Sequence, residues 1–319
     1  MYLPLISLLL KLCVLGAAFA SAFAAAPAPA QTLLGCENRC GNISMPYPFG
    51  TTEGCYIEQH FKVNCNHTYN PPKLFLEISN VEIIDIVLSG ELSISFFTAQ
   101  DCYNNQSLQA ANTKPYITLP EFPISYTRNN LTRVGWDTIA VIQGSNEGNN
   151  TAGCLSLCDS INNVTNGSCS GFGCCHTFIP KGMKSLSIRV SSHDRHTHVS
   201  DFNPCSYAFV AEETAYSFSS LDLKDLQGRT KVPVVLDWAV GNQRCDQAKK
   251  NLSTYACKDD NSDCVDFDNG PGYRCKCSKG YEGNPYIPNG CLGNHNLYLL
   301  KVFIFFLNID TMIYSMDNE

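Results

Sequence analysis

The sequence lacks the short motifs that mark common enzymes. It contains no Gly-x-Ser-x-Gly, no His-Glu-x-x-His and no phosphate-binding glycine loop, and neither the Gly-rich loop nor the His-Arg-Asp motif of a kinase. Its scattered Asp and Glu residues would permit a glycosidase with two carboxylates, but no pair stands out. We therefore expect a protein that is not an enzyme and that uses no cofactor.

Charge is scarce, and basic charge is scarcer. Only 16% of the 319 residues are charged, and 22 Lys and Arg stand against 29 Asp and Glu, giving a formal net charge of −7. A chain without a broad basic field is not expected to bind nucleic acid. An acidic ligand would have to be held by a few local cations, in a salt-sensitive way.

The C-terminal segment lacks the length of a membrane span. The apolar run from Leu297 to Leu307 has 11 residues, about 16 Å as a helix against roughly 30 Å of hydrocarbon. Extending it to Tyr314 takes in Lys301 and Asp310, which are costly near the bilayer centre. We expect residues 292–319 to form an apolar tail on a secreted protein; the alternative is association with the plasma membrane through that tail.

Helical periodicity is also missing, and short strand-like runs take its place. Residues 73–79, 81–88 and 91–97 are rich in β-branched and aromatic residues, and Leu92 and Ile94 alternate with serines. The same signal recurs, between Gly, Asn, Pro or Ser clusters, in residues 137–144, 185–192, 206–213 and 232–240. The prediction is a mainly β fold, with one face of each strand buried and long loops held by disulfides.

The N-terminal end of the chain and the cysteines indicate the cellular compartment. Residues 1–30 read as a secretory signal peptide, with an apolar stretch that ends in small residues. It contains Cys13, which leaves 17 of the 18 cysteines, a density that requires an oxidising compartment. We expect these cysteines to form disulfides in the extracellular space or cell wall. Their spacing does not suit a four-ligand zinc site, and we expect no metal.

Eight Asn-x-Ser/Thr sequons are spread between the signal and the tail. In a secreted chain such triplets predict glycosylation and hence a surface position. The predicted acceptors are Asn42, Asn66, Asn105, Asn130, Asn149, Asn163, Asn166 and Asn251.

The last six cysteines fall in a segment with almost no aliphatic side chains, which cannot build its own core. Its ending, "GYRCKCSKGYEGNPYIPNGC", resembles an EGF-like module, and we assign residues 245–291 to it. The resemblance implies three disulfides, each worth on the order of 3 kcal/mol. The implied pairs are Cys245 with Cys264, Cys257 with Cys275, and Cys277 with Cys291.

The other end of the chain, "GCENRCGNISMPYPFGTTEGCYIEQHFKVNC", resembles the galacturonan-binding module of plant wall-associated receptor kinases. Three later segments fit the same family: "GCLSLCDS" with "SCSGFGCCHTFIP", then "CSYAFVAEE", then "VPVVLDWAVGN". The resemblance implies disulfide-rich extracellular β modules followed by a small EGF-like domain. Its parts are a galacturonan-binding module at 33–105, a wall-associated-kinase-type β region at 106–240 and the EGF-like module, without a kinase domain.

One departure from that family concerns a cysteine. The family usually has Gly-Cys-Asp where this chain has Gly135-Trp136-Asp137, and residues 36–205 contain an odd number of cysteines, 11. One cysteine is therefore expected to lack a partner. One of the adjacent pair Cys174 and Cys175 is a candidate, since neighbouring cysteines normally bond to two different partners.

The resemblance implies a ligand, pectin or its oligogalacturonides, an acidic polymer of galacturonate. Such a ligand needs cations for its carboxylates and aromatic faces for its sugar rings. The first module offers few of either, and Tyr47 and Phe49 also suit a core because they flank prolines inside a disulfide knot. The predicted polysaccharide-binding residues are Arg39, Lys62, Lys73, Tyr47, Phe49 and Tyr56.

Two further features are assigned no function. Some EGF-like modules bind calcium through carboxylates before their first cysteine, but Cys245 follows "GNQR", and the later Asp266, Asp268 and Asn269 suit a turn. The run "SHDRHTH", residues 192–198, could be a metal site or pH sensor but reads as a solvated loop.

The sequence thus favours a non-catalytic extracellular protein that binds cell-wall polysaccharide. The alternative is a protein-interaction or decoy module that pairs with full-length receptor kinases of the same family.

Overall fold

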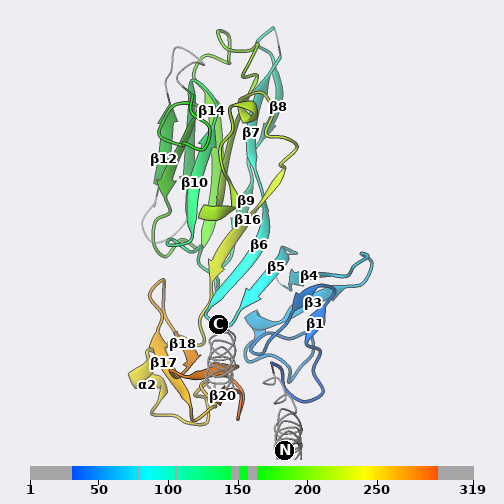
Figure 1. The fold of residues 1–319 in the computed structure, drawn as a ribbon, viewed down its shortest axis with the longest axis vertical. Helices are drawn as coiled ribbons and strands as arrows, with labels where there is room; N and C mark the ends of the chain where they lie inside the picture. Colours follow the sequence, from blue (N-terminus) through cyan, green and yellow to red (C-terminus); the bar gives the residue numbers. More distant parts are fainter. Residues whose placement is uncertain (1–30, 78–79, 105, 145–150, 157–163, 294–319) are drawn as a thin grey trace, which may run out of the picture.

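The computed structural model describes residues 31–77, 80–104, 106–144, 151–156 and 164–293. Figure 1 shows an elongated molecule in which a tall β body carries two small modules at one end. The N-terminal module, residues 31–66, lies on one side and the EGF-like module, residues 245–291, on the other. The mainly β prediction is confirmed: almost all described regular structure is strand. None of the described helices is long and apolar enough to cross a membrane. The predicted signal and tail lie outside the described residues.

One antiparallel sheet, here called the lower sheet, joins the N-terminal part to a strand from much later in the chain. Its order is β16-β6-β5-β4-β3. The bounds are β3 Val63–Asn66, β4 Lys73–Leu76, β5 Glu82–Val87, β6 Glu91–Phe97 and β16 Lys231–Asp237. The predicted alternation is confirmed in β6, where Leu92, Ile94 and Phe96 are buried and the serines between them are partly exposed. The sheet therefore has one core face and one face toward water.

Two further antiparallel sheets form the upper sandwich. The first has the order β13-β10-β15-β7-β8: β7 Ala99–Tyr103, β8 Gln109–Thr113, β10 Asn129–Val134, β13 Cys174–Phe178 and β15 Cys205–Glu212. The second has the order β12-β11-β14-β9: β9 Tyr116–Thr118, β11 Thr138–Gln143, β12 Thr151–Ser156 and β14 Ser185–Ser192. Leu131 and Val210 from one sheet join Ala140 and Ile188 from the other in one buried cluster, so the sheets pack face to face.

The remaining elements are short. The N-terminal module has the hairpin of β1 Arg39–Cys40 and β2 Ile43–Ser44 and the 3₁₀ turn η1 Gln59–Phe61. Two more 3₁₀ turns, η3 Glu213–Ala215 and η4 Ser220–Leu223, follow β15. The EGF-like module contains α2 Cys245–Ala248, β17 Ser262–Asp266, β18 Tyr273–Cys277, β19 Tyr281–Gly283 and β20 Cys291–Gly293.

The boundary that we placed between residues 105 and 106 does not separate two sheets. Strand β16 pairs with β6 along its whole length, from Lys231 opposite Phe97 to Asp237 opposite Glu91. Strand β7 continues directly from β6 into the upper sandwich, where it pairs with β15. Hydrogen bonding between strands far apart in sequence therefore makes one β body of the two predicted regions.

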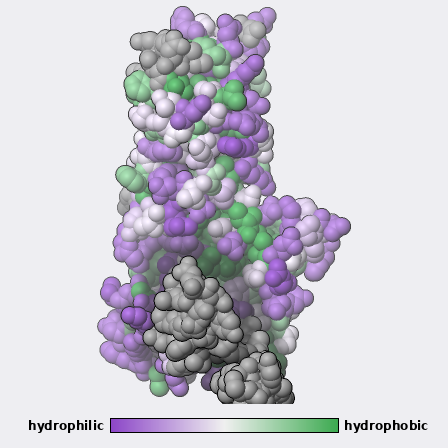
Figure 2. Space-filling model, in the orientation of Figure 1, coloured by the Kyte–Doolittle hydropathy of each residue, from purple (hydrophilic) through white to green (hydrophobic). Residues whose placement is uncertain are grey.

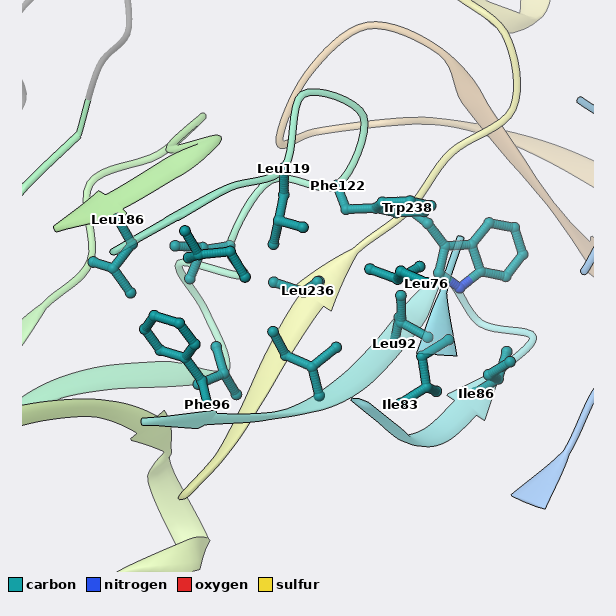
Figure 3. Packing of buried hydrophobic residues seen from close by; sticks show 14 of the residues in the cluster. Leu76, Ile83, Ile86, Leu92, Phe96, Leu119, Phe122, Leu186, Leu236 and Trp238 are labelled. Atoms are coloured by element: carbon teal, nitrogen blue, oxygen red, sulfur yellow. The ribbon is translucent and has the colours of Figure 1, made fainter. Parts of the chain in front are cut away.

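Trp238, the residue after β16, links the three parts of the molecule. Its ring meets Phe49 and Phe61 of the N-terminal module edge-on at 5.4 and 5.6 Å, and Tyr286 of the EGF-like module at 5.6 Å. The indole nitrogen donates a hydrogen bond to the backbone oxygen of Glu91 at 3.1 Å. Figure 3 shows this ring at the end of a row of buried aliphatic side chains from the lower sheet, so the core runs without a break into both modules.

The disulfides account for every cysteine in the described part of the chain. The EGF-like module contains Cys245–Cys264, Cys257–Cys275 and Cys277–Cys291, the same three pairs that the resemblance implied. The N-terminal module has Cys36–Cys55 and Cys40–Cys65, and the sandwich has Cys102–Cys205, Cys154–Cys175 and Cys169–Cys174.

The suggestion that Cys174 or Cys175 lacks a partner is wrong, because each bonds to a different cysteine. The eleventh cysteine of that stretch, Cys158, lies outside the described residues. Trp136, at the position where the family usually has cysteine, is 1% exposed. It is a core residue, and its ring meets Phe202 edge-on at 5.6 Å.

The hairpin between β17 and β18 fixes the EGF-like module to the body. Asp268 accepts hydrogen bonds from Tyr126 and Lys181. Buried Asn269 accepts from the backbone of Gly182 at 2.7 Å and donates to the backbone oxygen of Ile124 at 3.0 Å. The side chains of Asp268 and Asn269 are therefore hydrogen-bonded to other groups of the same chain, in the turn between β17 and β18. This is the structural role that we preferred to calcium binding.

Candidate ligand-binding surface

Arg39 is exposed on β1, beside a cleft of about 450 Å³ between the N-terminal module and β5. Its guanidinium donates a hydrogen bond to the backbone oxygen of Asn42 at 3.0 Å. The cleft is lined mostly by small polar and aliphatic residues: Gln31, Asn38, Ser44, Pro46, Ile86, Val87 and Leu88. It therefore offers a ligand one cation and no aromatic face.

Lys62 and Tyr56 form a second small group at the edge of the lower sheet. The Lys62 ammonium lies 2.8 Å from the carboxylate of Glu77, and the hydrogen bond raises the pKa of Lys62. Tyr56 is partly exposed and donates to Gln59 at 3.2 Å. Neither residue lines any of the three clefts that we describe.

The other two aromatic candidates belong to the interior. Phe49 is 1% exposed and packs against Phe61 and Trp238. The prediction that Phe49 contacts the polysaccharide is therefore wrong, since no face of its ring reaches solvent. Tyr47 is partly buried, and burial raises the pKa of its hydroxyl. Its backbone oxygen accepts a hydrogen bond from Asn284 of the EGF-like module at 2.7 Å, so this segment also serves to join modules.

A second cleft, of about 340 Å³, lies where the water-facing side of the lower sheet meets β9, within the range of roughly 300–1,000 Å³ that small-ligand sites occupy. We call it the lysine–aromatic groove. Its lining is Phe75, Asn80, Val81, Glu82, Ser95, Phe96, Phe97, Tyr116, Ile117, Thr118 and Lys231. Phe97 is 50% exposed and Tyr116 is 64% exposed, so two aromatic rings are open to a ligand. Figure 2 shows hydrophobic surface in the angle between the body and the projecting N-terminal module.

Two ammonium groups share one carboxylate in this groove. Glu82 lies 2.8 Å from the nitrogen of Lys73 and 4.0 Å from that of Lys231. The Lys231 nitrogen is 4.6 Å from the centre of the Phe97 ring, and that of Lys73 is 5.2 Å from the centre of the Tyr69 ring. The hydrogen bond to Glu82 raises the pKa of Lys73 and so favours the charged form of this side chain.

A third cleft, of about 440 Å³, lies where the β body meets the two small modules and has a different electrostatic character. Its charged lining is Glu58, Glu121, His60 and Lys184. Burial lowers the pKa of His60 despite the two carboxylates, which favours the neutral imidazole. With two carboxylates facing one lysine, this junction cleft repels a polyanion.

The structure therefore brings one predicted residue, Lys73, to the edge of the lysine–aromatic groove and leaves the others elsewhere. Sequence reasoning missed Phe97, Tyr116 and Lys231, which lie on β6, β9 and β16. One available signal was the sequence "SISFF" at residues 93–97: its alternation turns one of two adjacent phenylalanines toward water. An exposed aromatic residue beside a lysine is a feature of binding surfaces.

The described glycosylation acceptors are all on the surface. Asn42, Asn166 and Asn251 are exposed, and Asn66 and Asn130 are partly exposed. At Asn66 and Asn251 the side-chain oxygen accepts a hydrogen bond from a residue two positions later, and at Asn166 it accepts one from the backbone of Ser220. The amide nitrogen that would carry a glycan is not used in these bonds. Asn105, Asn149 and Asn163 lie outside the described residues.

The histidine run contains one buried side chain. His196 has no exposed surface and shares a 2.8 Å hydrogen bond with Ser206, while His193 and His198 are exposed. Burial lowers the pKa of His196 below its ordinary value of 6.5, although Asp101 and Asp194 act in the opposite direction. This part of the run is folded into the sandwich, and the expectation of a wholly solvated loop is wrong at His196.

The free energy of unfolding should fall as the pH drops from about 7 to about 5. The unfolded chain takes up a proton at His196 near pH 6.5, whereas the native state resists it, so protonation favours unfolding. His196→Asn should make this decline shallower, and the exposed His193→Asn should not. Urea unfolding at several pH values measures the slopes; equal slopes for wild type and His196→Asn would refute the assignment.

Comparison with known proteins gives two matched segments in the described part of the chain. A family model described as wall-associated receptor kinase galacturonan-binding matches residues 36–96, and one described as wall-associated kinase matches residues 166–245. No solved structure matches the chain significantly.

Several full-length plant proteins are similar to this chain. Wall-associated receptor kinase 2 of Arabidopsis thaliana is 39% identical over 80% of this chain and 34% of its own length. Wall-associated receptor kinases 5 and 1 of the same plant are 37% and 36% identical, with the same two coverages. The chain thus spans about a third of the length of these relatives.

Proposed function

The chain belongs to the wall-associated receptor kinase family through its extracellular domains, and on that premise we propose that it binds pectin or oligogalacturonides without catalysis. The match of residues 36–96 to a galacturonan-binding family carries the proposal. The lysine–aromatic groove supports it, because cations and open aromatic rings stand together there as an acidic sugar polymer requires.

The proposed location is the extracellular space or cell wall, reached through the secretory pathway. The dense disulfide framework and the exposed glycosylation acceptors suit that compartment. Association with the plasma membrane is the alternative location.

Purified protein should be retained on de-esterified pectin at low salt and released as the salt concentration rises. Few cations are available, so the attraction is local and is screened once the Debye length falls to about 10 Å, at 0.1 M salt. Methyl-esterified pectin is the matched control, since it keeps the sugar rings and loses the charges. Lack of retention at low salt, or equal retention on both polymers, would contradict the proposal.

A second function is favoured by a different observation. Ile139 and Leu155 are opposite each other on β11 and β12, 41% and 54% exposed, and Phe178 is 81% exposed on β13. Exposed apolar side chains of this kind suit a protein contact, as in pairing with a full-length receptor kinase. Co-precipitation with such a receptor that survives digestion of pectin would favour this function over the first.

A further inference from the structure

The lysine–aromatic groove is assembled from distant parts of the chain. Glu82 and Phe97 come from β5 and β6, Tyr116 from β9 and Lys231 from β16. Residues 36–96 and 166–245 are the two matched segments, and Tyr116 belongs to neither. The pairing of Lys231 opposite Phe97 creates the groove, so neither matched segment contains it alone.

Its charges are arranged around a single carboxylate. The side chain of Glu82 is 19% exposed, whereas those of Lys73 and Lys231 are 42% and 39% exposed. Each lysine ammonium group has three N–H donors. The single carboxylate of Glu82, shared by Lys73 and Lys231, can accept hydrogen bonds from only some of these donors. The arrangement already accommodates a carboxylate group, and the exposed rings of Phe97 and Tyr116 are next to it.

We propose that the lysine–aromatic groove is the subsite for one uronate residue of the bound polymer, and that Glu82 occupies the place of the uronate carboxylate until the ligand displaces it. The inference rests on the function proposed above. A uronate brings the two groups that the groove can use, a carboxylate for Lys73 and Lys231 and a sugar face for Tyr116 and Phe97.

Glu82 then acts as an internal competitor that sets both affinity and specificity. An esterified sugar has no charge with which to displace it from the lysines. A uronate can replace it, but must overcome repulsion from the displaced carboxylate. Glu82 therefore lowers affinity for acidic sugar and leaves affinity for neutral sugar almost unchanged.

Glu82→Gln tests this directly, because glutamine keeps the shape of the side chain and removes its charge. The affinity for a de-esterified oligogalacturonate should rise about threefold to tenfold, the range that one or two freed exposed ion pairs would give. Isothermal titration calorimetry at about 0.01 M salt measures it. The fully methyl-esterified oligomer should show a change below about twofold.

The sheet provides a matched control in Glu77→Gln. Glu77 pairs with Lys62 at 2.8 Å, as Glu82 does with Lys73, but does not line the groove. Both variants change the net charge equally, so a general charge effect would raise both affinities alike. We expect a gain for Glu82→Gln and an affinity close to wild type for Glu77→Gln.

A second variant removes the proposed contacts. Lys231→Ala combined with Tyr116→Ala changes two exposed side chains and should weaken oligogalacturonate binding about tenfold. Thermal unfolding of each variant, with a midpoint near that of wild type, checks that the fold is intact.

The outcomes separate the two proposals. If wild type binds oligogalacturonate but Glu82→Gln gains nothing, or gains no more than Glu77→Gln, the inference is overturned and the proposed function stands. If the double variant binds as wild type does, the inference is likewise overturned. If neither wild type nor Glu82→Gln binds, the proposed function fails and the inference fails with it.

Discussion

Trp238→Ala is expected to lower the free energy of unfolding by about 3–5 kcal/mol, the cost of removing a large aromatic side chain from a packed core. The indole has no exposed surface and contacts aromatic rings of both small modules. Its loss would leave a cavity bordered by Phe49, Phe61 and Tyr286, and would remove the donor to the backbone of Glu91.

The same variant should loosen the modules from the body. Disulfides hold the N-terminal and EGF-like modules internally, so they can stay folded while their docking weakens. Urea unfolding measures the loss of stability, and limited proteolysis near residues 239–244 measures the loosening. Leu252→Ala, at a side chain that is 75% exposed, is the control and should cost less than about 0.5 kcal/mol. Equal stability of the two variants would refute this role for Trp238.

Trp136→Ala should cost a similar amount, about 3–5 kcal/mol, but at the other end of the molecule. Trp136 is 1% exposed between β10 and β11, and its ring packs edge-on against Phe202. Its backbone nitrogen donates to Asn203 at 2.6 Å, a bond that alanine can keep. The loss is therefore one of packing, and it would be confined to the upper sandwich.

Urea unfolding of Trp136→Ala and Trp136→Phe would measure this contribution. Phenylalanine retains an aromatic ring and most of the apolar contact, so it should cost clearly less than alanine. Hydrogen exchange should show the loss of protection in the sandwich, with the EGF-like module unchanged. A cost below about 1 kcal/mol for alanine would mean that the tryptophan contributes little packing at the position where relatives are expected to have cysteine.

Local patterns in the sequence predicted seven strands of the β body, β4, β5, β6, β11, β14, β15 and β16, and did not single out others such as β7, β10 and β13. In β6, alternation between apolar residues and serine gave the buried face correctly, because neighbouring side chains on a strand point to opposite faces. The resemblance of residues 245–291 to an EGF-like module implied the three bridges that the structure forms. These features depend on residues close together in the chain.

The lysine–aromatic groove was not predictable in this way. It requires β16 to pair with β6 and β9 to lie beside them, although more than a hundred residues separate Phe97 from Lys231. The burial of the Phe49 ring could not be predicted either, because the ring that packs against it, Trp238, comes from a distant part of the chain. Long-range pairing decides which aromatic rings are open to a ligand, and local sequence pattern does not encode it.

The most direct test of the account is the ratio of the oligogalacturonate affinities of Glu82→Gln and Glu77→Gln, measured side by side at low salt. Both variants carry the same net charge, and only one empties the lysine–aromatic groove of its internal carboxylate. The account predicts a ratio of about three or more in favour of Glu82→Gln. A ratio of about one would contradict the placement of the acidic sugar in this groove.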